Sequence, residues 1–95
     1  MSAYVIFTRE KLINKSELDL YVEKAPAGFV GHPVKVLASH TKFEVIEGPN
    51  VESVVLLEFP SLQEAKAWYT SEAYKEALEH RMKAAEYRCV MVEGI

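Results

Sequence analysis

The chain has 95 residues, a length typical of one domain with a single hydrophobic core. Hydrophobic residues make up 49% and charged residues 26%, which is ordinary for a folded protein and excludes long disordered segments. The net charge is −3 and no basic run occurs, so neither nucleic acid nor an anionic membrane surface is an expected partner.

The residues 3–7, Ala-Tyr-Val-Ile-Phe, are apolar, aromatic and β-branched, which predicts a first strand. Asn14 followed by Glu17 predicts the start of a helix in which both side chains satisfy free backbone N–H groups. Apolar residues then continue at helical spacing. Pro26 should kink or restart this helix, and Pro33 should end it.

The middle of the chain predicts three strands. Residues 34–38 form an apolar run, and within residues 42–47 Phe43 and Val45 alternate with Glu44 and Ile46. A turn signal at residues 48–50, Gly-Pro-Asn, separates them from the central strand at residues 54–59.

The last third predicts helices and a final strand. Ser61 and Glu64 form a second capping signal. Residues 70–71, Thr-Ser, should break the helix and start another, whose apolar face runs over residues 73–85. Residues 87–92 then predict the last strand. The order indicates one domain over residues 1–95, an α+β sandwich with helices on one face of a mainly antiparallel, ferredoxin-like sheet.

Three of the predicted strands are apolar on both faces: residues 5–7, 54–57 and 89–92. The helices suffice to cover one face, so a second layer must cover the other. A second copy of the chain is the economical candidate, because twofold homodimers are the commonest oligomers. The alternative is that residues 26–33 fold over the sheet.

The sequence also resembles the domain of unknown function family DUF1330 of the dimeric α+β barrel superfamily, nearly from end to end. The resemblance is carried by residues 45–48 (VIEG), 57–61 (LEFPS), 67–69 (AWY), Ser71 with Tyr74, and Arg81 with 85–86 (AE). It implies a ferredoxin-like monomer whose sheet pairs with a second sheet, and it implies no established activity. Residues 33–41 depart from the family pattern by lacking its glycines and an arginine, so an anion held there by relatives is not expected here.

Glu58 interrupts an apolar strand, where burial would raise the pKa of its carboxyl and suit it to acid–base chemistry. The alternative is a structural ion pair with an arginine or lysine. Arg81 lies near the apolar face of the last helix and could clamp a substrate carboxylate. Alternatively, it pairs with a buried acid such as Glu58 or Glu47.

Trp68 and Tyr69 are interpreted as core residues, with the lining of a pocket as the alternative. His32 lies where a helix meets a strand, near the expected cleft, whereas His40 and His80 are expected to face solvent. No pair of histidines has metal-ligand spacing, so neither a metal nor another cofactor is expected, and haem is the weakest alternative.

The sequence favours a small homodimeric protein that binds a small, partly apolar molecule between sheet and helices. An enzyme is one version, in which Glu58 or His32 abstracts a proton from an acidic carbon while Arg81 or Tyr69 holds the oxyanion. It would act without a cofactor, like the superfamily's monooxygenases and isomerases, although that is an analogy of fold. A non-catalytic ligand-binding or assembly module is the alternative.

The single cysteine, Cys89, cannot form a disulfide within the chain and is expected to be inert. The chain shows neither a signal peptide nor an apolar run near the roughly 20 residues of a spanning helix. We therefore expect a cytoplasmic protein.

Overall fold

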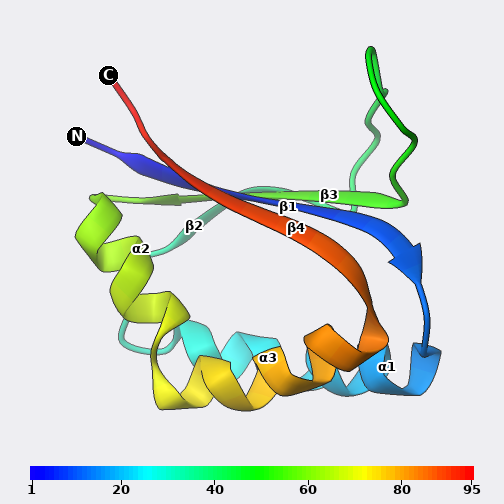
Figure 1. Cartoon of the computed structure of the whole chain (residues 1–95). Helices are drawn as coiled ribbons and strands as arrows, with labels where there is room; N and C mark the ends of the chain where they lie inside the picture. Colours follow the sequence, from blue (N-terminus) through cyan, green and yellow to red (C-terminus); the bar gives the residue numbers. More distant parts are fainter.

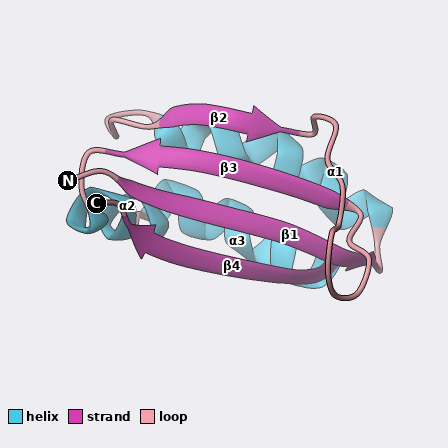
Figure 2. Cartoon of the chain, turned by 90° about the horizontal axis from the view of Figure 1, so that it is seen from above, coloured by secondary structure: helices cyan, strands magenta, loops and turns pink.

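A computed structural model describes residues 1–95 and contains one antiparallel sheet with helices on one side (Figure 1). The elements in chain order are β1 (Ala3–Leu12), α1 (Lys15–Lys24), a 3-10 helix η1 (Ala25–Phe29), β2 (Lys35–Ser39), β3 (Ser53–Phe59), α2 (Leu62–Tyr69), α3 (Glu72–Ala84) and β4 (Ala85–Glu93). The strand order β2-β3-β1-β4 confirms the predicted ferredoxin-like sandwich (Figure 2).

The two faces of the sheet differ in what covers them. The inner face, which includes Val5 and Phe7 of β1 and Leu57 of β3, packs on the helices and is buried. The outer face includes Tyr4 and Ile6, and no helix or strand covers it (Figures 1 and 2). The sheet thus has the bare second face that the sequence predicted.

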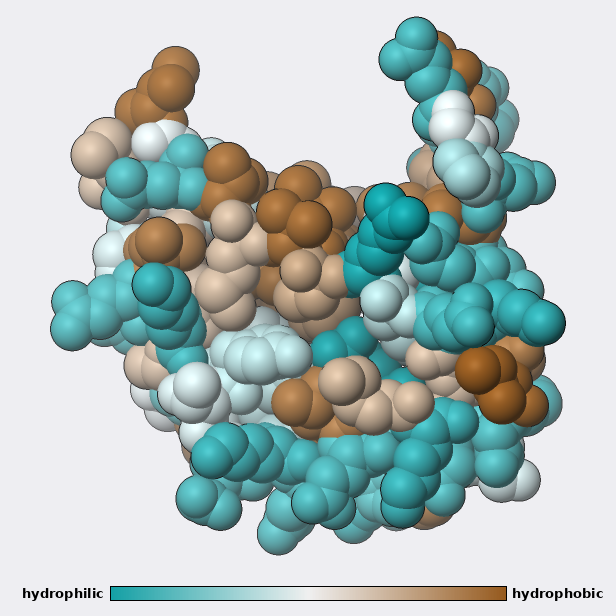
Figure 3. Space-filling view, in the orientation of Figure 1, coloured by the Kyte–Doolittle hydropathy of each residue, from teal (hydrophilic) through white to brown (hydrophobic).

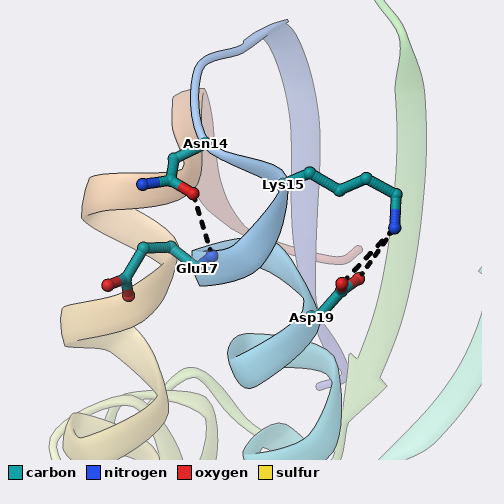
Figure 4. Close-up of polar contacts among 4 residues, drawn as sticks. All are labelled: Asn14, Lys15, Glu17 and Asp19. Atoms are coloured by element: carbon teal, nitrogen blue, oxygen red, sulfur yellow. Dashed lines mark hydrogen bonds and ion pairs between the residues drawn. The ribbon is translucent and has the colours of Figure 1, made fainter.

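Helix α1 begins at the predicted N-cap, because the Asn14 side-chain oxygen accepts a hydrogen bond from the Glu17 backbone N–H at 3.3 Å (Figure 4). The reciprocal bond from the Glu17 side chain is not formed. Its carboxylate instead contacts His80 Nδ1 at 2.6 Å, and the Asn14 backbone N–H donates to the Ala84 carbonyl. Asn14 therefore caps the start of the helix, whereas the Glu17 side chain links α1 to α3 through His80.

The two later helices begin where serines predict them. The hydroxyl of Ser61 accepts from the Glu64 backbone N–H, and that of Ser71 accepts from the Tyr74 N–H. Pro26 does restart the helix, since α1 ends at Lys24 and the tighter η1 follows.

An aromatic cluster around Trp68 forms the core between the inner face and the helices. The Trp68 side chain is 1% exposed, and its ring lies 4.3 Å from that of Tyr74 and 5.3 Å from that of Phe59, centre to centre. Phe29 of η1 stacks on Trp68 at 5.8 Å. This contact holds η1 on the helical side, so the alternative in which residues 26–33 cover the outer face is wrong.

The predicted strand at residues 42–47 is also wrong. These residues lie in an irregular loop, residues 40–52, which stands out from the sheet on the side away from the helices (Figure 1). Both sides of β3 are paired, with β1 and with β2, so this segment cannot pair with β3, and it joins neither free outer edge of the sheet, on β2 or on β4. No helix of the structure is both long and apolar enough to cross a membrane.

Candidate ligand-binding site

A cavity of about 310 Å³ lies between the inner face of the sheet and the helices α1 and η1. Apolar side chains form most of its wall, among them Leu18 and Val22 of α1, Phe29 of η1 and Val55 of β3. Its volume is at the lower end of the range for small-molecule sites in proteins. The helical spacing of α1 and the alternation of β3 place these side chains on facing surfaces.

Arg81 is the buried charged residue of the cavity wall. It is 3% exposed, and its guanidinium carbon lies 4.9 Å from the ring centres of both Phe7 and Tyr87. Its Nε has no hydrogen-bond partner, and no carboxylate lies within ion-pair distance. The two aromatic faces offset part of the cost of burying this charge.

Further hydrogen-bond donors surround the same region. The buried Trp68 Nε1 has no acceptor. The hydroxyl oxygens of Tyr21, in the cavity wall, and Tyr74 lie 3.0 Å apart, so one phenol donates to the other and the second phenolic hydrogen remains free. Burial raises the pKa of both tyrosines, the positive charge of Arg81 opposing that rise, and both are neutral near pH 7.

The polar wall residues His40, Ser53 and Arg9 have partners of their own. His40 Nδ1 lies 3.1 Å from the Ser53 hydroxyl, and Arg9 Nε lies 3.2 Å from Glu52. His40 has a φ of 56°, in the left-handed region that few side chains adopt, at the point where the chain leaves β2 for the loop. This conformation turns the chain while its ring reaches the cavity.

The structure brings together only part of the site predicted from the sequence. Trp68 and Arg81 line the cavity, whereas Tyr69 packs beside Trp68 and His32 lies after η1, neither lining it. Glu58 points to the outer face, where it neighbours Tyr4 and Lys35 on the adjacent strands.

Glu58 and Arg81 therefore lie on opposite sides of the sheet and form no ion pair. Glu47, the other acid considered for Arg81, is exposed in the loop. Odd-numbered residues of β3 face the helices, as the buried Leu57 and Phe59 show, so position 58 points outward. The strand alternation was sufficient to place Glu58 on that face.

Sequence reasoning missed His40, Tyr21 and Ser53 as cavity residues. The expectation that His80 faces solvent is wrong, since its ring is partly buried and pairs with Glu17. His40 is exposed as expected, but its ring also contacts Ser53 at the cavity. Tyr21 lies on the predicted apolar face of α1, and that position was the available signal. The left-handed turn at His40 had no sequence signal.

Cys89 lies on the inner face against the core, where burial raises the pKa of its thiol. It is half-buried and forms no disulfide. No group of three or more histidine, cysteine, aspartate or glutamate side chains is arranged to hold a metal ion.

The outer face forms a second candidate surface. Its apolar side chains gather between two upright segments, one at the chain termini and one at the loop 40–52 (Figure 3). Val90 and Val92 of β4 are 54% and 45% exposed, and Ile46 in the loop is 84% exposed. The patch is continuous with the partly buried Tyr4 and Leu56. Apolar patches of this kind mark interaction surfaces.

The sheet order and the one-sided helices define a small α+β protein of the ferredoxin-like type. The chain belongs to the family described as Domain of unknown function (DUF1330), whose profile matches residues 2–95. This agrees with the resemblance seen in the sequence. No curated protein matches the chain.

Solved structures share the fold at low sequence identity. A protein of unknown function from Rhodopseudomonas palustris is 17% identical with a TM-score of 0.75, the match covering 99% of this chain and 82% of that one. A dimeric ferredoxin-like protein of unknown function from Jannaschia sp. is 14% identical with a TM-score of 0.68, covering 99% and 100%. SnoaB, a cofactor-independent oxygenase from Streptomyces nogalater, is 7% identical with a TM-score of 0.67, covering 99% and 93%.

Proposed function

We propose that the protein binds a small, partly apolar molecule in the cavity between the sheet and helices α1 and η1. The observation that carries this proposal is a cavity of about 310 Å³ with an apolar wall and a buried, unpaired Arg81. A core without a ligand would be expected to collapse around the apolar wall and to pair its buried polar groups. Concave apolar sites with a few convergent polar groups are typical of ligand binding.

A fragment screen by ligand-observed NMR tests the proposal with two matched variants. Leu18→Trp places an indole in the cavity wall, whereas Leu20→Trp places the same group on the exposed side of α1. We expect fragments that bind the wild-type protein and Leu20→Trp but not Leu18→Trp. Fragments that bind all three proteins equally, or none at all, would contradict the proposal.

We also propose that two copies associate through their outer faces. The outer face of the sheet is apolar and uncovered, and the loop 40–52 rises beside it (Figure 1). A second sheet could pack on this face and contact the loop. Dimeric ferredoxin-like proteins among the structural neighbours support self-association. The single, half-buried cysteine supports a cytoplasmic location.

A cofactor-free enzyme is the second candidate, and His40 is the observation that favours it. Its ring reaches the cavity and pairs with Ser53, while Glu58 and His32, the bases proposed from sequence, do not line it. An imidazole here could accept a proton from a bound acidic carbon, with the Arg81 guanidinium stabilising the oxyanion. The cofactor-independent oxygenase among the neighbours shares the fold.

Turnover of phenolic, lactone and keto substrates by the wild-type protein and His40→Gln tests the enzyme candidate. We expect turnover that falls about a hundredfold or more in the variant, as for the loss of a general base. Absence of turnover, or turnover that does not depend on His40, would leave binding as the function.

A further inference from the structure

We propose that the ligand of this cavity is an anion, a small carboxylic acid with an aromatic or branched apolar body, whose carboxylate binds Arg81. The inference rests on the proposed binding function and names the chemical class of the ligand.

Arg81 carries a buried charge that has no partner within the protein. Arg81 is 3% exposed, its Nε is buried without an acceptor, and none of the ion pairs of the protein includes it. Arginine keeps its charge in proteins, so it cannot escape the cost of burial by losing a proton. The rings of Phe7 and Tyr87 contact the guanidinium group but accept no hydrogen bond in its plane.

Hydrogen-bond donors without partners also gather around the cavity. The buried Trp68 Nε1 lacks an acceptor, and the Tyr21–Tyr74 pair leaves one phenolic hydrogen free. No aspartate or glutamate lines the cavity, and the nearby Arg9 is already paired with Glu52. A ligand group that only accepts hydrogen bonds and carries negative charge would satisfy this set, and a carboxylate is such a group.

The rest of the cavity wall limits the size and the polarity of the part of the ligand beyond its carboxylate. Phe29, Val36 and Val55 add apolar surface to the wall, and the cavity holds only about 310 Å³. A sugar phosphate or nucleotide would leave its polar atoms without partners there. A small acid with an apolar body matches both the charge of Arg81 and the apolar wall.

The alternative is that Arg81 is purely structural, held by its two aromatic contacts. Arg81→Met separates the two explanations, because methionine fills much of the same space without the charge. A structural arginine would make the variant less stable. An arginine kept for a ligand would leave the thermal midpoint of the ligand-free protein unchanged or higher, since removing an unpaired buried charge relieves its desolvation cost.

Binding is measured with matched acid and amide pairs that differ in charge but hardly in shape: benzoate with benzamide, cinnamate with cinnamamide, and naphthoate with naphthamide. The proteins are the wild type, Arg81→Met, Arg81→Lys and the control Lys83→Met, which removes an exposed charge from the same helix. We expect an acid to bind the wild type and Lys83→Met at least about tenfold more tightly than its amide. Arg81→Met should abolish this preference, and Arg81→Lys should retain part of it.

The possible contrary results separate the anionic ligand from the binding function itself. Equal binding of acid and amide, or a preference that survives Arg81→Met, would overturn the anionic ligand while leaving the binding function intact. A marked loss of stability in Arg81→Met without any loss of the preference for acids would assign Arg81 a structural role. Failure of every acid and every amide to bind would overturn both proposals.

Discussion

The hydroxyl oxygens of Tyr21 and Tyr74 lie 3.0 Å apart and join α1 to α3 beside the cavity. Their rings meet edge to face, with centres 6.3 Å apart. Burial raises the pKa of both phenols, so the folded protein holds both in the neutral form. This pair makes the stability of the protein depend on pH in the alkaline range. It also connects the core residue Tyr74 with Tyr21 in the cavity wall.

Stability should fall as the pH rises above about 10, the usual pKa of tyrosine. Below that pH both tyrosines are protonated in the folded and unfolded states, so their contribution is constant. Above it the unfolded chain loses these protons first, which lowers the free energy of unfolding by up to about 1.4 kcal/mol per pH unit for each tyrosine. Denaturant unfolding at several pH values, with tyrosinate absorbance, measures this. Ionisation of all five tyrosines in the folded state near pH 10 would contradict it.

Removing both hydroxyl groups of the pair should cost less than the sum of the two single removals. Tyr74→Phe or Tyr21→Phe leaves a partly buried hydroxyl without its partner, at a cost of about 1–3 kcal/mol, whereas the double variant removes both groups. We expect a double variant that is less destabilised than the sum of the single changes. Chemical denaturation of the four proteins gives the coupling. Strict additivity would show that the hydrogen bond contributes nothing.

Gly28 lies in close contact with Tyr74 of α3, which leaves little room for a side chain. A Cβ atom there would lie 3.1 Å from the Tyr74 Cβ and 3.2 Å from its Cα, and the second of these is backbone. Gly28→Ala should therefore destabilise the protein by about 1–3 kcal/mol, because η1 must move away from α3. Ala27→Ser, at the exposed neighbouring position, serves as the control and should change stability by less than about 0.5 kcal/mol. Thermal unfolding of both variants compares them, and equal midpoints would refute the close contact.

The outer face should lose self-association when it acquires charge. Val90→Asp places a carboxylate within the apolar patch, where an apposed sheet would desolvate it. We expect sedimentation velocity to show a two-chain species for the wild type and a single chain for the variant. Met82→Glu, on the exposed side of α3, is the matched control and should remain associated. A monomeric wild type would remove the dimer proposal.

The sequence predicted the fold because its strongest signals are local. The caps at Asn14, Ser61 and Ser71 and the periodicity between them are sufficient to order the elements. The strand predicted at residues 42–47 failed for a reason that no local pattern contains. Both sides of β3 are paired with β1 and β2, so residues 42–47 could join the sheet only at the outer edge of β2 or β4, and they join neither.

The site was predictable only in part. Trp68 and Arg81 were singled out as pocket candidates, and both line the cavity, although their roles stay predictions. Glu58 attracted attention by its chemistry, yet the alternation of β3 directs it to the opposite face. His40 reaches the cavity through a left-handed turn, and the Tyr21–Tyr74 pair depends on how α1 packs against α3. Such tertiary relationships do not follow from residue spacing.

Native mass spectrometry of the protein taken directly from cell lysate tests the central claim, ligand binding in the cavity, most directly. The account predicts a folded protein that carries a stoichiometric small molecule, absent from Leu18→Trp and released as an organic acid on unfolding. A protein that carries no bound mass in the wild type, or the same mass in Leu18→Trp, would contradict it.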